Sequence, residues 1–249
     1  MKRHSDTFTR LLAATSLLLL AVSAYAADVD PQLEQARARV AEMFETIDPE
    51  HVNPSPIDGW FTVQKGSVVA YISADGRYLL QGDLIDLDQQ VNLSELSRTD
   101  ARRDLVNALE DEESILFAPD EVKHAVTVFT DVDCTYCRKL HAEIDQYMSH
   151  GIAVRYVLYP RNGPASRAWT TSEEVLCASD PGRALTAAKL GQKFESSRCS
   201  TSMLTRHYTL GQDIGLSGTP AIVLEDGTLI SGYVNAAMLD MRVRAAATR

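Results

Sequence analysis

The sequence predicts an α/β protein, and three observations lead to this fold class. Two apolar runs, 125–130 and 152–159, flank a segment with helical spacing at 134–148, which is typical of a strand–helix–strand unit with parallel strands. After a mostly helical stretch, two further strands are predicted at 221–224 and 228–233. Ahead of this domain, short β runs separated by glycines follow one amphipathic helix, so a small α+β region is expected first.

The first 26 residues have the features of a secretory signal peptide. Three basic side chains precede an apolar run, Leu11 to Val22, which ends at Ala24-Tyr25-Ala26, the small-x-small pattern of a signal-peptidase site. The run is shorter than the roughly 20 residues that a membrane helix needs. We therefore expect cleavage after Ala26, with an uncleaved anchor as the weaker alternative, and a soluble exported protein.

Composition limits the functional classes. The chain carries 24 Lys and Arg against 34 Asp and Glu, a net charge of −10, and it becomes more acidic once the signal peptide is removed. A nucleic-acid binder needs a basic face to neutralise phosphates, so we expect no nucleic-acid partner. All four cysteines follow residue 26. In an oxidising compartment an even number of cysteines suggests two pairs.

The N-terminal half is predicted to be a small domain joined to a connecting helix. An amphipathic helix over 31–47 ends at Asp48-Pro49, because proline disfavours helical geometry in the residue before it. The short strands of 60–87 form a thin core with unpaired edges, so we expect pairing with a second copy of the chain. Folding onto the rest of its own chain is the alternative. The charged segment 92–113 suits an exposed connecting helix, and 118–120 mark a boundary.

The Cys-x-x-Cys turn at Cys134 and Cys137 is the candidate reactive site. It lies where a predicted strand meets a predicted helix, and the N–H groups and dipole at a helix start favour an anion. The first cysteine should therefore form the thiolate that attacks disulfides. We expect no metal, because a structural zinc site needs four ligands and no second Cys-x-x-Cys follows. A purely structural disulfide within so short a loop would add little stability.

The neighbouring residues have simpler interpretations. Asp131 and Asp133, if ionised, would raise the pKa of Cys134, and Asp133 is expected to cap the helix rather than transfer protons. His141 is expected to be packed and not catalytic. Bridging Cys177 and Cys199 would close a loop worth about 3 kcal/mol, so we expect a structural disulfide there, with a second exchange-active pair as the alternative.

Four motifs carry a family resemblance: Thr127 to Asp131, Cys134 to His141, Val154 to Tyr156 and Ser217 to Ala221. With them, nearly the whole mature chain resembles the bacterial periplasmic disulfide-bond isomerases of the DsbC/DsbG type. The resemblance implies a thioredoxin fold with a helical insertion, preceded by a small α+β (cystatin-like) dimerisation domain and a linker helix. The family commonly has Gly-Tyr between the two cysteines, whereas this chain has Thr135-Tyr136.

The resemblance and the signal peptide together divide the chain into four parts. These are the signal peptide 1–26, the N-terminal dimerisation domain 27–90, the linker helix 91–117 and the thioredoxin-like catalytic domain 118–249.

The roles of the site residues follow from their positions. Cys134 should attack a substrate disulfide, and Cys137, one turn further along and more buried, should resolve the mixed disulfide. Pro220 resembles the cis-proline of the family, which would turn the Thr219 backbone toward an extended substrate segment. Tyr136 is expected to be exposed and could contact substrate.

The resulting hypothesis is a periplasmic, homodimeric disulfide isomerase without a cofactor. Its substrates would be misfolded exported proteins with non-native disulfides, and the family implies that the membrane reductase DsbD donates electrons. One alternative is a net thiol oxidase of DsbA type, which the N-terminal β region disfavours. Another is a holdase chaperone that uses the cleft of the dimer and does not need the cysteines.

Overall fold

The computed structural model describes residues 30–197, 199 and 202–248, so the predicted signal peptide lies outside the described residues. None of the helices in those ranges is long and apolar enough to span a membrane. The described chain forms two compact units. One contains the residues up to Phe61 together with Ile72–Leu79, and the other contains Thr62–Tyr71 and the residues from Leu80 onward.

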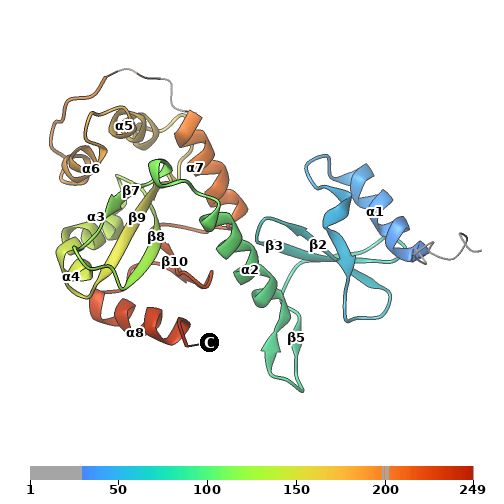
Figure 1. The fold of residues 1–249 in the computed structure, drawn as a ribbon. Helices are drawn as coiled ribbons and strands as arrows, with labels where there is room; N and C mark the ends of the chain where they lie inside the picture. The colour runs from blue at the N-terminus through green and yellow to red at the C-terminus, as the bar shows by residue number, and fades with distance from the viewer. Residues whose placement is uncertain (1–29, 198, 200–201, 249) are drawn as a thin grey trace, which may run out of the picture. The chain divides into compact units, whose positions relative to one another are not determined.

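Helix α1, Pro31–Met43, begins the first unit (Figure 1). The side chain of Asp30 accepts a hydrogen bond from the N–H of Gln32, and proline occupies the first helical position, where a missing N–H costs nothing. Val40 is fully buried. The predicted helix over 31–47 is thus present but four residues shorter at its C-terminal end.

Short strands follow, as the β-rich pattern predicts. After the 3-10 turn η1, Pro49–His51, the strands are β1 Val52–Pro54, β2 Trp60–Lys65, β3 Val68–Ser73, β4 Leu79–Leu80, β5 Ile85–Asp86 and β6 Val91–Asn92. The first four are ordered β1-β2-β3-β4 in one sheet. Strands β5 and β6 form an antiparallel ribbon in which Ile85 is opposite Asn92.

Helix α2, Leu93–Asn107, is capped by the side chain of Asn92. It ends six residues before the predicted boundary, and the η2 turn, Asp111–Glu113, takes over. Only part of α2 is exposed, because Val106 is buried with Phe129 and Val157 of the following sheet. The expectation of a largely exposed connecting helix is therefore wrong on this face, where tertiary packing gives the sparse apolar residues a partner.

The larger unit contains a five-stranded sheet in the order β11-β10-β8-β9-β7. The strands are β7 Ile115–Phe117, β8 His124–Thr130, β9 Ile152–Leu158, β10 Ala221–Val223 and β11 Leu229–Ser231. The predicted parallel pairing is confirmed, with Val126 opposite Val154 and Thr130 opposite Leu158. The predicted pair at the end is also confirmed, since β10 runs antiparallel to β11 and to β8.

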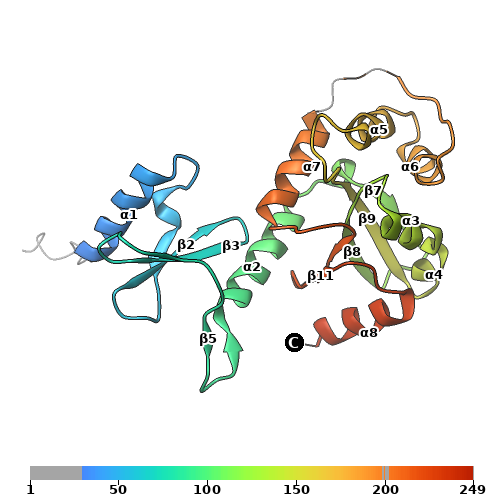
Figure 2. The ribbon, with the colours of Figure 1, turned by 180° about the vertical axis from the view of Figure 1, so that it is seen from behind.

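Both faces of this sheet are covered, which explains why β8 and β9 are apolar without alternation. One face packs against helices α3, α4 and α8 and the insertion α5 to α7, around buried residues such as Val128 and Leu140. The other face packs against α2 and the end of α7, around Phe129. Figures 1 and 2 show this layering from opposite sides. The α/β fold class is thus confirmed.

The predicted helix over 134–148 is broken into α3, Thr135–Ala142, and α4, Ile144–Ser149. Glu143 separates them, and its carboxylate accepts a hydrogen bond from the Tyr233 hydroxyl. Tyr147, on α4, is fully buried and donates to the Val234 carbonyl. These contacts to the segment before α8, Ala236–Ala246, outweigh a continuous helix.

The helical insertion consists of α5 Arg167–Leu176, α6 Pro181–Lys189 and α7 Ser202–Asp213 (Figure 2). Ser166 caps α5 and Asp180 caps α6, each through its side-chain oxygen. Helix α6 ends at Lys189, and a loop follows it as far as Ser197. Within α7, Gly211 lies so close to the Tyr159 ring that a Cβ atom would overlap it.

Candidate active site

Cys134 occupies the N-cap position of α3, immediately after the loop that leaves β8. Its backbone is extended, and its own Sγ accepts a hydrogen bond of 3.3 Å from the N–H of Cys137. The prediction that Asp133 caps this helix is wrong. Its carboxylate instead pairs with Arg138 at 3.2 Å, because Cys134 already fills the capping position.

Both cysteines are free thiols and both are buried, with 3% of Cys134 and 1% of Cys137 exposed. The loop before β10 covers the first sulfur, since the Cys134 thiol donates to the Thr219 carbonyl over 3.2 Å. The peptide between Thr219 and Pro220 is cis, as the resemblance implied.

The surroundings of the two thiols shift their pKa values in opposite directions. Burial would raise the pKa of Cys134, but the Cys137 thiol and the Thr219 hydroxyl, which can donate hydrogen bonds to its thiolate, lower it overall. The Cys137 N–H and the charge of Arg161 act in the same direction. Burial raises the pKa of Cys137, and its other contacts do not reverse this. The thiolate thus forms preferentially at Cys134, the nearer of the two to the helix start.

The Thr219 hydroxyl is placed to respond to that ionisation. Its Oγ1 is buried and has no hydrogen-bond partner among the described residues while Cys134 is a thiol. An unpaired buried hydroxyl is unfavourable. Donating to a thiolate would satisfy it, which is the interaction that lowers the pKa of Cys134.

Asp131 is buried beneath the turn and fully engaged. Its Oδ2 accepts from the backbone N–H and the Nε of Arg161 at 3.1 and 3.0 Å, and its Oδ1 accepts from the Asp133 N–H at 2.8 Å. Asp131 was expected to oppose ionisation of Cys134, whereas Arg161 neutralises it and favours the thiolate. Sequence reasoning missed Arg161, although it follows β9 and the ends of parallel strands β8 and β9 lie at one sheet edge.

A second buried layer lies behind Cys137. His141 is 5% exposed and bonds to the Tyr156 hydroxyl through Nδ1 at 3.2 Å and to the Thr186 hydroxyl through Nε2 at 2.9 Å. Burial and the nearby Lys189 lower the pKa of His141 to about 4, so the ring is neutral at physiological pH. The expectation of a packed histidine is confirmed. Lys189 itself was missed by the sequence reasoning.

The surface beside the cysteines is aromatic and cationic. Tyr136 is 61% exposed, as expected, and its ring stacks on that of Tyr233 with centroids 6.4 Å apart. Lys139 Nζ lies 4.3 Å from the centroid of the Tyr233 ring. The exposed Tyr136 ring, backed by the partly buried Tyr233 ring, suits contact with a peptide without selecting one sequence.

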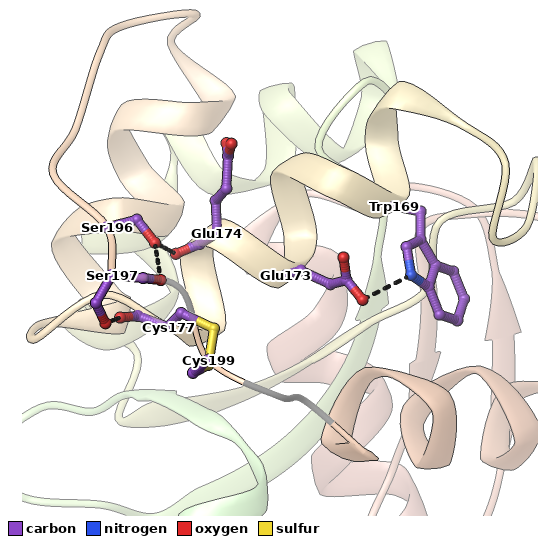
Figure 3. Close-up of a disulfide and its surroundings, with 7 residues drawn as sticks. All are labelled: Trp169, Glu173, Glu174, Cys177, Ser196, Ser197 and Cys199. Carbon is purple, nitrogen blue, oxygen red and sulfur yellow. Dashed lines mark hydrogen bonds between the residues drawn. A yellow bond between two sulfur atoms is a disulfide. The ribbon is translucent and has the colours of Figure 1, made fainter.

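Cys177 and Cys199 form a disulfide with 5.7 Å between their Cα atoms, so the predicted pairing is present (Figure 3). The bond ties the C-cap of α5 to the loop before α7. Ser197 reinforces it, since its hydroxyl donates to the Cys177 carbonyl over 2.8 Å. Figure 3 also shows Ser196 bonded to the Glu174 carbonyl one turn earlier.

Within the described ranges, no cluster of three or more His, Cys, Asp or Glu side chains is arranged to hold a metal ion. The chemistry that the site offers is that of its thiols: a thiolate of lowered pKa, a second thiol three residues away, and a backbone carbonyl beside the first sulfur.

Comparison with known proteins gives matches over both parts of the chain. A thioredoxin-like domain model matches residues 112–247, and a model of the disulfide bond isomerase protein N-terminal domain matches residues 25–95. Thiol:disulfide interchange protein DsbC of Dickeya dadantii is 39% identical over 218 residues, which cover 88% of each chain. DsbC of Escherichia coli K12 is 36% identical over 216 residues, 87% of this chain and 88% of the relative. A solved disulfide interchange protein from Neisseria gonorrhoeae has 25% identity and a TM-score of 0.48, covering 55% of this chain and 98% of that one.

Proposed function

Since the chain belongs to the DsbC family of thiol:disulfide interchange proteins, we propose that Cys134 and Cys137 are the residues that perform its exchange reaction. The protein is a disulfide isomerase with a thioredoxin-like domain. One observation carries the assignment of roles. The Cys134 sulfur lies at the start of α3, where surrounding donors lower its pKa, while burial raises that of Cys137.

In the first step, the Cys134 thiolate attacks one sulfur of a substrate disulfide. A bond forms between Cys134 and that sulfur, the substrate disulfide breaks, and the second substrate sulfur leaves as a thiolate. That thiolate can attack another disulfide of the same substrate, and a later attack on the mixed disulfide returns Cys134 as a thiolate. The net reaction rearranges disulfides without oxidising or reducing the substrate.

Cys137 provides an exit from mixed disulfides that do not rearrange. Its thiolate attacks the Cys134 sulfur, the bond to the substrate breaks, and the substrate leaves as a thiolate. The site is then a Cys134–Cys137 disulfide, which must be reduced before another cycle. We propose that the membrane reductase DsbD supplies these electrons.

Thr219, Pro220 and Tyr136 are proposed to bind the substrate. The Thr219 carbonyl accepts the Cys134 thiol proton in the free site, so ionisation of that thiol frees the carbonyl for a substrate N–H in a strand-like contact. The exposed ring of Tyr136 would lie beside the bound segment. Both contacts recognise backbone or apolar surface, which suits substrates of varied sequence.

We further propose that the protein is a periplasmic homodimer acting on misfolded exported proteins. In this proposal, 1–26 is the cleaved signal peptide, 27–90 the dimerisation domain, 91–117 the linker helix and 118–249 the catalytic domain. Exposed apolar side chains near β4 and β5 support dimerisation, namely Tyr78, Leu79, Leu80, Ile85 and Leu87. Measuring the mass in solution tests this, and a monomer would contradict it.

Isomerisation of scrambled ribonuclease by the Cys134→Ser variant tests the catalytic role. We expect activity to be lost, and retained activity would contradict the assignment. Trapping the thiols by alkylation in cells separates isomerase from net oxidase. The isomerase requires Cys134 and Cys137 to be mostly reduced, whereas a mostly oxidised pair would favour the oxidase.

A further inference from the structure

Lys189 is buried without a carboxylate partner. It is the last residue of α6 and only 3% of it is exposed. Its Nζ donates to the Thr130 hydroxyl over 2.7 Å and lies 5.7 Å from the centroid of the Tyr156 ring. The ion pairs formed by the described residues do not include Lys189. A buried ammonium is costly unless a negative group balances it.

Two contacts fix Lys189 close to the exchange site. Helix α6 packs against α3, and Thr186, one turn before Lys189, bonds to His141 over 2.9 Å. His141 lies one turn after Cys137 on α3. Thr130, which accepts the Lys189 hydrogen bond, ends β8 just before the loop to the Cys-x-x-Cys turn. Lys189 therefore reaches the floor of the site from the helical insertion.

The ionisable groups around Lys189 come from α3 and from the strands beneath it: Cys134, Cys137, Arg138, His141, Asp131 and Tyr156. Asp131 is already paired with Arg161 at 3.0 Å. Burial raises the pKa of Tyr156 and lowers that of His141 to about 4, so both are neutral. The two thiols remain as groups that can supply a negative charge.

Among the described residues, β7 and α5 also pack against α6, and neither places a free carboxylate at Lys189. Strand β7 has no ionisable side chain. In α5, Arg167 and Glu174 are exposed, and the Glu173 carboxylate accepts from the indole N–H of Trp169 at 3.0 Å (Figure 3). Cys137 and Cys134 are therefore the main groups whose negative charge can interact with the Lys189 ammonium.

We propose that Lys189 is a positioning residue for the exchange reaction, whose buried ammonium group stabilises the Cys137 thiolate and thereby favours the reduced site. This inference rests on the proposed roles of Cys134 and Cys137. Burial raises the pKa of Cys137, and the charge of Lys189 opposes that rise. Reciprocally, burial lowers the pKa of Lys189 to about 8, and the thiolates oppose this.

Oxidation of the two cysteines removes the thiolate charge near Lys189. When the Cys137 thiolate attacks the Cys134 sulfur, the substrate leaves as a thiolate and the two cysteines become a neutral disulfide. The Lys189 ammonium then loses the thiolate charge and keeps only the carboxylate of Asp131 nearby, which is already paired with Arg161. Lys189 therefore makes the disulfide form less favourable, and it also raises the fraction of Cys137 that is ionised and able to resolve mixed disulfides.

The first test measures the equilibrium of the full chain with glutathione. Lys189→Met removes the charge and keeps an unbranched side chain, whereas Lys189→Arg keeps the charge. Lys193→Met, at an exposed lysine four residues further along, is the matched control. A one-unit rise in the pKa of a thiol shifts the equilibrium toward the disulfide by up to about tenfold, or about 30 mV, at a pH where that thiol is ionised in the unsubstituted protein. The equilibrium is therefore followed from about pH 7 upward, and the shift caused by Lys189→Met should grow toward this limit as Cys137 ionises. The other two variants should stay within about twofold.

The second test uses the unsubstituted protein, so it does not depend on whether a variant folds. The side-chain carbon signal of Lys189 is titrated by NMR in the reduced and oxidised protein, and its pKa should be higher in the reduced form. An equal pKa in both forms, or an unchanged equilibrium for Lys189→Met, would overturn the inference. Isomerisation of scrambled ribonuclease is followed in parallel. If it persists in either of those cases, the proposed function stands and only the role of Lys189 fails.

Discussion

Replacing His141 by glutamine should make the protein less sensitive to acid. The imidazole is 5% exposed, and both of its nitrogens bond to hydroxyl groups, of Tyr156 and Thr186. Burial and the charge of Lys189 lower its pKa from 6.5 to about 4. As the pH falls through 6.5, the unfolded chain binds a proton here that the folded protein binds only near pH 4. Stability is therefore lost on acidification across this window.

The size of the effect follows from the width of the window. The His141 pKa falls from 6.5 to about 4 on folding. At about 1.4 kcal/mol per pKa unit, the free energy of unfolding therefore decreases by about 3 kcal/mol when the pH falls from about 7 to about 4. Glutamine stays neutral and can still form hydrogen bonds, although it loses the packing of the ring. The comparison is therefore the change in stability with pH for each protein, rather than its value at one pH.

The assay is urea unfolding at about pH 7 and about pH 4. His141→Gln should lose about 3 kcal/mol less than the unsubstituted protein between the two conditions. His51→Gln, at an exposed histidine, should follow the unsubstituted protein. Equal losses for His141→Gln and the unsubstituted protein would refute the reasoning.

Three further predictions concern the site, the core and the disulfide. Thr219→Val removes the hydroxyl that lowers the pKa of Cys134, so this pKa should rise, seen as slower alkylation near neutral pH. Gly211→Ala places a methyl group against an aromatic ring and should cost about 1 to 3 kcal/mol in thermal unfolding. Replacing Cys177 and Cys199 together by alanine should cost about 3 kcal/mol while isomerisation persists well below the melting temperature.

Each of these has a control and a contradicting result. Thr219→Ser keeps the hydroxyl and should leave the Cys134 pKa near its original value; equal reactivity of the valine and serine variants would contradict the role of the hydroxyl. Gly82→Ala adds a methyl group with nothing within 4 Å, and it should be nearly neutral. A folded variant that lacks the Cys177–Cys199 bond and has lost isomerisation would indicate an exchange-active pair.

The main features of the fold could be predicted from local patterns. The parallel β8–α3–β9 unit follows from two apolar runs around one amphipathic segment, and the break at Glu143 does not, because it depends on contacts with the distant Tyr233. The buried face of α2 was missed for the same reason. Its apolar residues are sparse, and only the sheet packed against them makes Val106 part of a core.

In the site, the cysteines and Pro220 were predictable, since their motifs are continuous in the sequence. Arg161 and Lys189 were not singled out, because an Arg or Lys in a helical or loop segment is usually solvated. A signal for Lys189 did exist. It lies four residues after the fully buried Leu185 and next to Ala188, on the apolar stripe of α6.

The central claim is that Cys134 attacks the substrate and Cys137 resolves the intermediate. Its most direct test is to mix reduced Cys137→Ala protein with scrambled ribonuclease, quench with acid and map the trapped mixed disulfide by mass spectrometry. Attachment of the substrate at Cys134 is the predicted result. Attachment at Cys177 or Cys199, or no trapped species while isomerisation continues, would contradict the claim.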